Sequence, residues 1–350
     1  MSAHPVRLPV PGRGHGWMPV SACTPGCLPG PGALPTVGRL RVTARLLGML
    51  ALVAAAVPLA VVLPLLPGPG RGGLLRAMFR GMLRLAGVRL VHSGAARFVP
   101  TAEELAAAGG PSSGCSGDRR LGVLMVANHL SWLDILVLGA VQPMRMVAKR
   151  EIRDWPVLGA LAARAGTLFV DRCGLRSLPA LVTETAAALR GGAVVGLFPE
   201  GTTWCGAASG SFRRAGFQAA LDAGVPVRPV AQRMRLADGT STGVGAFVGE
   251  DTLVASLLRV VRLPELVVEV EVLPPLVAEP GTDRRALARR AELVVALATG
   301  VPAPAAPARP AVRRPLRPAD GPAGTAASAA GPAGAAEGPA ARPAAPAEAA

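Results

Sequence analysis

His129 and Asp134 are the residues of this 350-residue chain whose types and spacing best suit acid–base chemistry. They stand in the run NHLSWLD, residues 128–134. A histidine titrates near neutral pH and can take a proton from a hydroxyl group, and a carboxylate beside it fixes the tautomer and orientation of the imidazole. The pair is a weak signal alone, because a histidine also serves as a polar residue at a strand end. It predicts a general base only where other features agree.

The spacing of the pair predicts its position in the fold. Five residues turn about 500° around an α-helix, so the two side chains would point to different faces of one helix. We therefore expect His129 in the turn after a strand over 122–127, and Asp134 in the first turn of the next helix. Asn128 or Ser131 is expected to cap that helix. Asn128 is also the only asparagine of the chain, and Lys149 is its only lysine.

Three later runs give the pair a context. GTLFVDR at 166–172, FPEGT at 198–202 and VPVRPV at 225–230 follow NHLSWLD along the chain. The four runs resemble, in order, the four sequence blocks of the glycerolipid acyltransferase family, the lysophosphatidic acid acyltransferases and their relatives. The resemblance covers roughly residues 80–275. The chain departs from the family pattern at Trp204-Cys205 and at Arg228, and both departures bear on the identity of the acceptor.

The resemblance implies a phosphate site. The arginine of the family's second block contacts the phosphate of the acceptor, which points to Arg172, and a guanidinium binds phosphate through two hydrogen bonds. A surface ion pair with Asp171 is the alternative role. Lys149, just after a strand, would add positive charge to the pocket or be a solvated lysine. Arg213 and Arg214 are secondary phosphate candidates, or else the basic first turn of a helix.

The third block implies that Glu200, Gly201 and Thr202 bind the acceptor. Gly201 would let the backbone approach closely in the turn after a strand. The carboxylate of Glu200 would repel a phosphate. We therefore expect Glu200 to hold a glycerol hydroxyl or to organise arginines.

The resemblance also implies a reaction. His129 would take the proton of a lysolipid hydroxyl, the oxygen would attack the thioester of acyl-CoA or acyl-carrier protein, and backbone amides would stabilise the oxyanion. No metal or organic cofactor is implied, since the thioester is a co-substrate. The expected acceptor is 1-acyl-glycerol-3-phosphate, which gives phosphatidic acid. Lyso-ornithine lipid and glycerol 3-phosphate are alternative acceptors, and a non-catalytic lipid-binding membrane protein is the alternative of another class.

The elements that must position these residues alternate along the chain. Short apolar or β-branched runs predict strands at 88–91, 122–127, 144–148, 167–170, 193–198, 225–230 and 266–272. Helical stretches lie near 132–141, 155–165, 178–190, 212–223, 252–261 and 284–298. This alternation predicts a single α/β domain with a largely parallel central sheet flanked by helices. Residues 100–120 are expected to form a loop beside the ligand site, which such sheets place where strands end.

The net charge of +15 is concentrated near the N-terminus. Eleven arginines precede the first acidic residue, Glu103. They flank apolar runs, and aromatic residues make up only 3% of the chain, so base-stacking surfaces are scarce. The pattern disfavours a nucleic-acid binder and indicates anionic membrane lipid as the partner. The oligomeric state is not indicated.

Residues 46–66 form an uncharged apolar run of 21 residues, long enough to cross a bilayer core. Pro58 and Pro64 would kink a helix there, so a hairpin in one leaflet fits as well as a straight span. In the next run, 74–90, Arg76, Arg80 and Arg84 align in one stripe, which suits a helix at the lipid interface or one packed on its own domain. We predict a membrane anchor with an interfacial helix over 39–87, at the cytoplasmic membrane, with the catalytic domain on the cytoplasmic side.

The ends of the chain have a different composition. Residues 1–38 are rich in Pro and Gly, and residues 301–350 are almost wholly Ala, Pro, Gly and Arg, so both are predicted to be disordered. An acyltransferase domain over 88–300 remains. The five cysteines are odd in number and scattered, which argues against a disulfide framework and for a reducing compartment. Cys23 and Cys27 resemble half a metal site, but no second Cys or His pair has a suitable spacing, so no zinc is expected.

Overall fold

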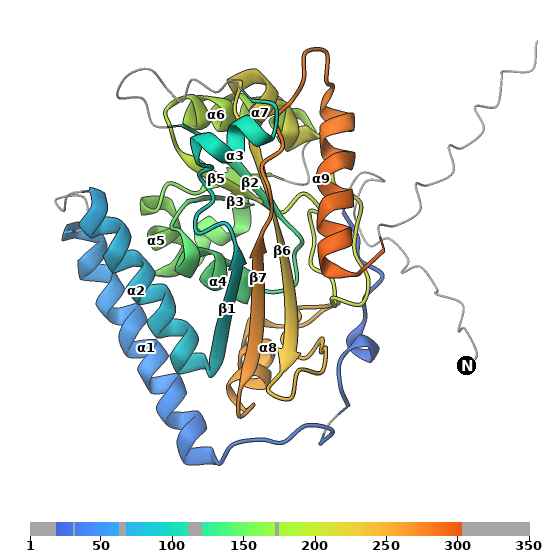
Figure 1. The fold of residues 1–350 in the computed structure, drawn as a ribbon. Helices are drawn as coiled ribbons and strands as arrows, with labels where there is room; N and C mark the ends of the chain where they lie inside the picture. Colours follow the sequence, from blue (N-terminus) through green and yellow to red (C-terminus); the bar gives the residue numbers. More distant parts are fainter. Residues whose placement is uncertain (1–18, 31, 63–67, 111–120, 172–174, 303–350) are drawn as a thin grey trace, which may run out of the picture. The chain divides into compact units, whose positions relative to one another are not determined.

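A 7-stranded sheet organises the described part of the chain, which in this computed structural model comprises residues 19–30, 32–62, 68–110, 121–171 and 175–302. The strand order is β1-β7-β6-β2-β5-β3-β4 (Figure 1). Neighbouring strands run parallel in every pair except β6 and β7, which are antiparallel. This arrangement confirms the predicted α/β fold with a largely parallel sheet.

The strands lie where the alternating pattern predicted them. They are β1 (Val88–Gly94), β2 (Val123–Ala127), β3 (Arg145–Lys149), β4 (Leu168–Val170), β5 (Val194–Leu197), β6 (Val227–Leu236) and β7 (Leu266–Val272). β6 extends six residues beyond its predicted end at 230, because its second half pairs with the whole of β7.

Nine α-helices occur in the described residues. They are α1 (Arg39–Val62), α2 (Gly68–Ala86), α3 (Ala102–Ala107), α4 (Leu133–Val141), α5 (Leu158–Arg164), α6 (Leu178–Arg190), α7 (Ala215–Ala223), α8 (Leu253–Val261) and α9 (Arg284–Thr299). The prediction of a loop over 100–120 missed α3. Thr101 and Glu104 form a capping box at its start, each side chain accepting the other residue's backbone N–H. Residues 111–120 of that predicted loop lie outside the described residues.

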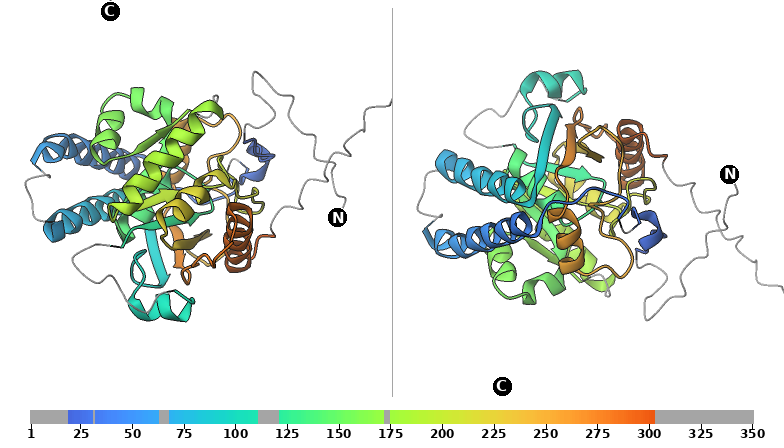
Figure 2. Two further views of the ribbon diagram at one scale, coloured as in Figure 1. Left: turned by 90° about the horizontal axis from the view of Figure 1, so that it is seen from above. Right: turned by 90° about the horizontal axis from the view of Figure 1, so that it is seen from below.

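Helices cover both faces of the sheet (Figure 2). β2 is buried along its whole length, and successive side chains of a strand point to opposite faces. Val123, Met125 and Ala127 accordingly join the cluster that contains residues of α2, α4 and α8. Leu124 and Val126 join the cluster with residues of α6, α7 and α9. The central strand is therefore apolar on both sides, as parallel sheets between helices require.

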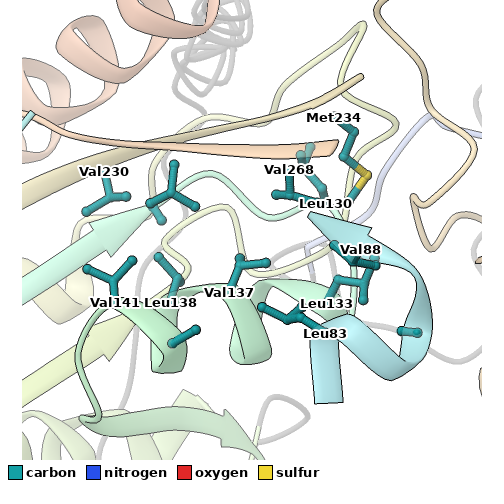
Figure 3. Close-up of a cluster of buried hydrophobic side chains, with 14 of the residues drawn as sticks. Leu83, Val88, Leu130, Leu133, Val137, Leu138, Val141, Val230, Met234 and Val268 are labelled. Carbon is teal, nitrogen blue, oxygen red and sulfur yellow. The ribbon is translucent and has the colours of Figure 1, made fainter. Parts of the chain in front are cut away.

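The packing of α4 matters most for the site, because α4 carries Asp134. Figure 3 shows Val137, Leu138 and Val141 of α4 pointing toward the sheet side chains Val230 and Val268. All these residues are buried in one cluster. The first turn of α4 is thereby held against the sheet.

Helices α1 and α2 form an antiparallel hairpin, and Figures 1 and 2 show them side by side. A Cβ at Gly48 of α1 would lie 2.6 Å from the side chain of Leu85 in α2, and one at Gly81 of α2 would lie 3.4 Å from Leu52 in α1. These two contacts pair the middle of α1 with the last two turns of α2. The two outer ends of the hairpin are the start of α1 and the end of α2. The end of α2 leads directly into β1, and the start of α1 is attached to the domain by Arg45, so both outer ends meet the domain.

Arg45 fixes the start of α1 on the domain. Its guanidinium is buried and donates to three carbonyls at the end of α8 and just beyond, those of Val261, Leu263 and Pro264. Elsewhere α1 exposes large apolar side chains. Among the described residues, α1 alone is long and apolar enough to cross a membrane, with 24 residues and 11% of its most apolar window buried.

The predicted disorder of residues 1–38 needs correction for residues 19–30 and 32–38. Cys23 is 5% exposed, and the backbone N–H of Val37 donates to the carbonyl of Arg262. This segment is held because its apolar side chains and backbone groups find partners on the domain. Residues 1–18 and 303–350, with most of the predicted tail, lie outside the described residues, so the other domain limits stay predictions.

Arg228, which departs from the family pattern, has a structural position. It is completely buried, and its guanidinium pairs with both carboxylate oxygens of Glu104 at 2.9 Å. It also donates to the carbonyls of Phe98 and Leu273. Arg228 therefore joins α3 and the segment after β1 to the sheet.

Candidate active site

The predicted site residues gather at one edge of the sheet. β2, β5, β3 and β4 are neighbours and run parallel, so their carboxyl ends share that edge. His129 follows β2, Glu200 follows β5, Lys149 ends β3 and Asp171 follows β4. At about 4.8 Å per strand, the row from β2 to β4 is about 14 Å long. Arg172, the predicted phosphate ligand, lies outside the described residues and directly follows Asp171 in the chain.

His129 and Asp134 are in contact, across the strand-to-helix turn that their spacing predicted. The Nδ1 atom of His129 lies 2.7 Å from Oδ2 of Asp134. Asp134 is the second residue of α4 and is completely buried, whereas the His129 side chain is 22% exposed. Oδ2 also accepts two backbone N–H groups and so acts as an acceptor; in the neutral imidazole that suits this contact, Nδ1 carries the hydrogen and Nε2 carries the lone pair. Nε2 is then the atom that can take a proton.

The same carboxylate orders the backbone of the turn. Oδ2 of Asp134 also accepts the N–H groups of Leu130 and Ser131, at 2.7 and 3.0 Å. The prediction that Asn128 or Ser131 caps α4 was wrong, since the N-cap position is Trp132 and no side chain caps it. Instead, the side chain of Asp134, in the first turn of α4, accepts the backbone N–H groups of Leu130 and Ser131, which precede the helix.

The ring and the peptide of His129 are fixed by the loop after β5. The imidazole stacks on the ring of Phe198, with centroids 4.0 Å apart and planes 6° from parallel. The backbone N–H of His129 donates to Oε2 of Glu200 at 2.6 Å, and its carbonyl accepts the N–H of Trp204 at 2.8 Å. The first and third sequence blocks therefore form one unit.

Glu200 is a buried carboxyl group that binds backbone. It is 3% exposed; Oε2 accepts from His129, and Oε1 accepts from the N–H of Gly210 at 2.8 Å. Burial raises the pKa of Glu200 to about 8, although the N–H groups of Gly210 and His129 act in the opposite direction. The expectation that Glu200 organises arginines is not met among the described residues, where its hydrogen bonds go to backbone amides. An acceptor contact by Glu200 stays a prediction.

Gly201 has the left-handed backbone that favours glycine, with φ at +75°. The N-terminal segment lies against it, because a Cβ at Gly201 would be 2.5 Å from Cγ of Pro19. The half-buried Thr202 comes next. Thr203 then donates its hydroxyl to the carbonyl of Phe247, which ties this loop to the segment before α8. The roles of Gly201 and Thr202 in acceptor binding remain predictions.

The sequence did not predict the contact between two polar residues beside the site. Asn128 and Gln232 of β6 bind each other reciprocally: Asn128 Oδ1 accepts the N–H of Gln232, and Asn128 Nδ2 donates to its carbonyl. The Gln232 side chain donates in return to the Asn128 carbonyl at 2.9 Å. Both residues are buried, so this lock fixes the residue before His129. The solitary occurrence of asparagine in the chain was the available signal, and nothing marked Gln232.

The basic candidates lie around the same edge. Lys149 is half-buried and pairs in register with Val170, the last residue of β4. The backbone N–H of Arg213 donates to the carbonyl of Pro199, and Arg214 immediately precedes α7. Lys149 and Arg213 are therefore next to the chain that leads to Arg172 and to the third block, respectively. Their binding of phosphate stays a prediction.

Comparisons with known proteins agree with this arrangement. The family model described as Acyltransferase matches residues 114–233. A lyso-ornithine lipid O-acyltransferase from Pseudomonas aeruginosa is 40% identical over 183 residues, which cover 52% of this chain and 70% of that protein. A 1-acyl-sn-glycerol-3-phosphate acyltransferase from Neisseria gonorrhoeae is 37% identical over 171 residues, which cover 49% of this chain and 67% of that protein.

A solved structure supports the fold. The crystal structure of the 1-acyl-sn-glycerophosphate acyltransferase from Thermotoga maritima superposes with a TM-score of 0.51 at 20% identity, over 74% of this chain and 96% of that one. At this identity the likeness concerns the fold. The sequence matches go further, and with the site geometry they show that the chain belongs to the glycerolipid acyltransferase family.

Proposed function

We propose that this O-acyltransferase transfers a fatty acyl group from a thioester to the free hydroxyl of a lysolipid, with His129 as the general base. The observation that carries the proposal is the contact of 2.7 Å between His129 Nδ1 and the buried Asp134 carboxylate. That contact orients the ring and leaves Nε2 to accept a proton. Family membership supports the reaction class.

The proposed reaction needs no covalent enzyme intermediate. Nε2 of His129 takes the hydroxyl proton while the oxygen attacks the thioester carbonyl, and Asp134 stabilises the resulting imidazolium. The tetrahedral intermediate then collapses, the C–S bond breaks, and the thiolate leaves as a thiol with the proton from His129. The donor is acyl-CoA or acyl-carrier protein, and the residues used here require no metal or organic cofactor.

The acceptor is a lysophospholipid or a close relative of one. 1-Acyl-glycerol-3-phosphate, which would give phosphatidic acid, is supported by the relative from Neisseria gonorrhoeae and by the sequence position of Arg172 after β4. Lyso-ornithine lipid is the second candidate, because a relative from Pseudomonas aeruginosa with 40% identity is named for it. The two acceptors differ chemically in one decisive respect, since only the first contains a phosphate.

An assay of the purified full chain on 1-acyl-glycerol-3-phosphate, lyso-ornithine lipid and glycerol 3-phosphate tests the acceptor. With the phosphate-bearing acceptor, Arg172→Ala should raise KM for the acceptor and leave KM for the donor unchanged. A change confined to the donor would rule out the phosphate role. Faster turnover of lyso-ornithine lipid, with no effect of Arg172→Ala, would favour the second acceptor.

His129→Ala tests the base itself. We expect a loss of roughly 10²–10⁴-fold in kcat/KM, the usual contribution of a general base. His92→Ala is the matched control, because the His92 side chain is exposed and its hydrogen bond goes to the nearby carbonyl of Ala95. Acyl transfer at the wild-type rate by folded His129→Ala protein would sink the catalytic proposal.

The hairpin supports membrane association on the cytoplasmic side. Because both outer ends of α1–α2 meet the domain, the arginines at the start of α1 and at the end of α2 lie on one side of any membrane that the hairpin enters. Clusters of Arg beside a membrane segment favour the cytoplasmic side. Acyl-CoA and acyl-carrier protein would be available there.

A further inference from the structure

Three cysteines from two segments that are far apart in the sequence meet next to the active site. The Sγ atoms of Cys23, Cys27 and Cys205 all lie within 4.8 Å of one another. Cys23 and Cys205 are buried, Cys27 is exposed, and all three are free thiols. From Cys23 to Cys205 the separation is 182 residues, which is why no zinc site was expected from spacing alone. The fold supplies the partner that the sequence did not reveal.

Local structure turns the thiols toward one another. The 3-10 helix Pro25–Cys27 closes with a hydrogen bond from the Cys27 N–H to the carbonyl of Thr24, which brings Cys27 back beside Cys23. The backbone N–H of Cys205 donates to Sγ of Cys23 at 3.3 Å. Such N–H···S bonds support a sulfur atom that carries negative charge. Two separate segments therefore converge on one cluster of sulfur atoms.

The surroundings suit a thiolate-bound ion. Ala246 and Val248 are buried against Cys23 and Cys205, and Leu28 and Trp204 pack around this cluster. An apolar shell limits access of bulk water to the ligands. On the other side, Cys27 and Cys205 line a cavity of about 230 Å³, which has room for a water molecule as a further ligand.

We propose that Cys23, Cys27 and Cys205 together bind one thiophilic divalent cation, with Zn²⁺ as the representative ion. Zinc binds thiolates at about 2.3 Å in a tetrahedron, so ligand sulfur atoms lie about 3.8 Å apart. The three thiols, already within 4.8 Å, need only a small contraction. Three protein ligands and a water molecule complete the four positions. This site is independent of the acyl-transfer proposal.

The bound ion would hold the N-terminal segment on the active-site loop. Cys205 follows Trp204, whose N–H binds the carbonyl of His129, and Pro19 lies on Gly201. The metal would thus fasten residues 19–28 to the loop that positions His129. It acts as a positioning element and takes no part in the reaction.

Metal content and a cobalt spectrum test the site directly. The full chain is purified in reductant, stripped with a chelator and titrated with Zn²⁺ or Co²⁺. We expect roughly one ion per chain, and for Co²⁺ a sulfur-to-metal charge-transfer band in the near ultraviolet. Cys27→Ser should lose both, and because Cys27 is exposed this variant should fold. Cys23→Ser, the second variant, should likewise lose the bound ion and the charge-transfer band.

The two remaining cysteines provide the matched control. Cys115 and Cys173 lie outside the described residues, and the variant with both changed to Ser should bind the ion as the wild type does. Absence of stoichiometric metal from the wild type, or retention of the charge-transfer band in Cys27→Ser, would overturn the proposal. So would a Cys23–Cys205 disulfide, found by mass spectrometry after alkylation without reductant, in wild-type protein that takes up no metal. Thermal unfolding gives an additional readout: Zn²⁺ should raise Tm of the wild type and not of Cys27→Ser.

Discussion

At the residue scale, one oxygen of Asp134 serves both the histidine and the turn that carries it. Oδ2 receives hydrogen bonds from His129, Leu130 and Ser131, whereas Oδ1 is buried without a hydrogen-bond partner among the described residues. The carboxylate can therefore lose its charge while the shape of the turn survives. This separates its electrostatic contribution from its structural one.

Asp134→Asn exploits that separation. The amide oxygen of Asn can accept the Leu130 and Ser131 N–H groups, and its NH₂ group can take the place of the unpartnered Oδ1. The negative charge that stabilises the imidazolium is lost, so we expect kcat/KM to fall by roughly 10²–10⁴-fold. Tm should fall only modestly, by the equivalent of about 1–3 kcal/mol, because the buried NH₂ group gains no acceptor among the described residues. Asp222→Asn is the control, since Asp222 is exposed. An equal loss of Tm and activity would instead indicate that Asp134 acts through folding alone.

Glu200 gives a prediction about pH. Burial raises its pKa to about 8 from 4.5, so between these values the folded chain holds a proton that the unfolded chain has released. The free energy of unfolding contributed by Glu200 is therefore fully present below about pH 4.5 and is lost as pH rises toward about 8.

Denaturant titrations of wild type and Glu200→Gln across that pH range measure the effect. The wild type should lose stability relative to the variant as pH rises, because Gln does not titrate. Glu250→Gln is the control, since Glu250 is exposed. A constant difference between wild type and Glu200→Gln at all pH values would contradict the raised pKa.

The sequence revealed the candidate base but not its supports. His129 and Asp134 were predicted in contact across a strand-to-helix turn, because helical geometry excludes their meeting on one helix face. The two backbone amides that bind Glu200 could not be predicted, since one comes from His129, 71 residues earlier, and the other from Gly210, at the far side of an irregular loop. Local sequence patterns do not indicate which loops lie next to each other in the folded chain.

At the element scale, β6 is longer than predicted because its second half pairs with β7. Apolar alternation marked only its parallel half, whereas the second half is a polar antiparallel ladder with β7. Arg233 and Arg235 of β6 form ion pairs there with Glu269 and Glu271 of β7. Since cross-strand pairing depends on a partner about 35 residues away, sequence runs alone could not predict it. The other strand positions followed from periodicity.

Arg228 tests how α3 is attached to the sheet. Arg228→Met would leave Glu104 and two carbonyls without their buried partner, and we expect a loss of about 3–5 kcal/mol in the free energy of unfolding. Arg89→Met is the matched control, because the Arg89–Glu265 pair is exposed and should contribute at most about 1 kcal/mol. Activity per folded molecule should stay within about twofold, since this pair lies outside the site. A change of acceptor preference in Arg228→Met would contradict a purely structural role for Arg228.

At the scale of the whole described domain, charge and apolar surface are arranged around the hairpin. α1 exposes Leu47 and Leu50 at 61% and 65%, although they belong to a helix whose start is fastened to the domain by Arg45. Arg41 and Arg39 precede them on the same helix. Exposed leucines next to arginines match an anionic lipid surface, where apolar burial and charge attraction act together. Pro58, one of the two prolines expected to kink the helix, lies inside α1, which continues to Val62, and Pro64 lies outside the described residues. The antiparallel neighbourhood of α1 and α2 follows from their contacts and not from the prolines.

Leu47→Glu/Leu50→Glu tests this surface by vesicle sedimentation of the full chain. Burying one leucine contributes about 1.5–3 kcal/mol, so we expect at least about tenfold weaker partition into vesicles that contain anionic phospholipid. The matched control is Leu293→Glu/Leu297→Glu, which changes two leucines of α9 that are 57% and 73% exposed. It should partition as the wild type does, because α9 lies on the opposite face of the sheet from α2. Equal losses in both double variants would mean that general surface charge, and not the hairpin, controls binding. If only the α1 variant fails to bind, then α1 is the helix that holds the domain, with the sheet edge that carries His129, at the lipid surface.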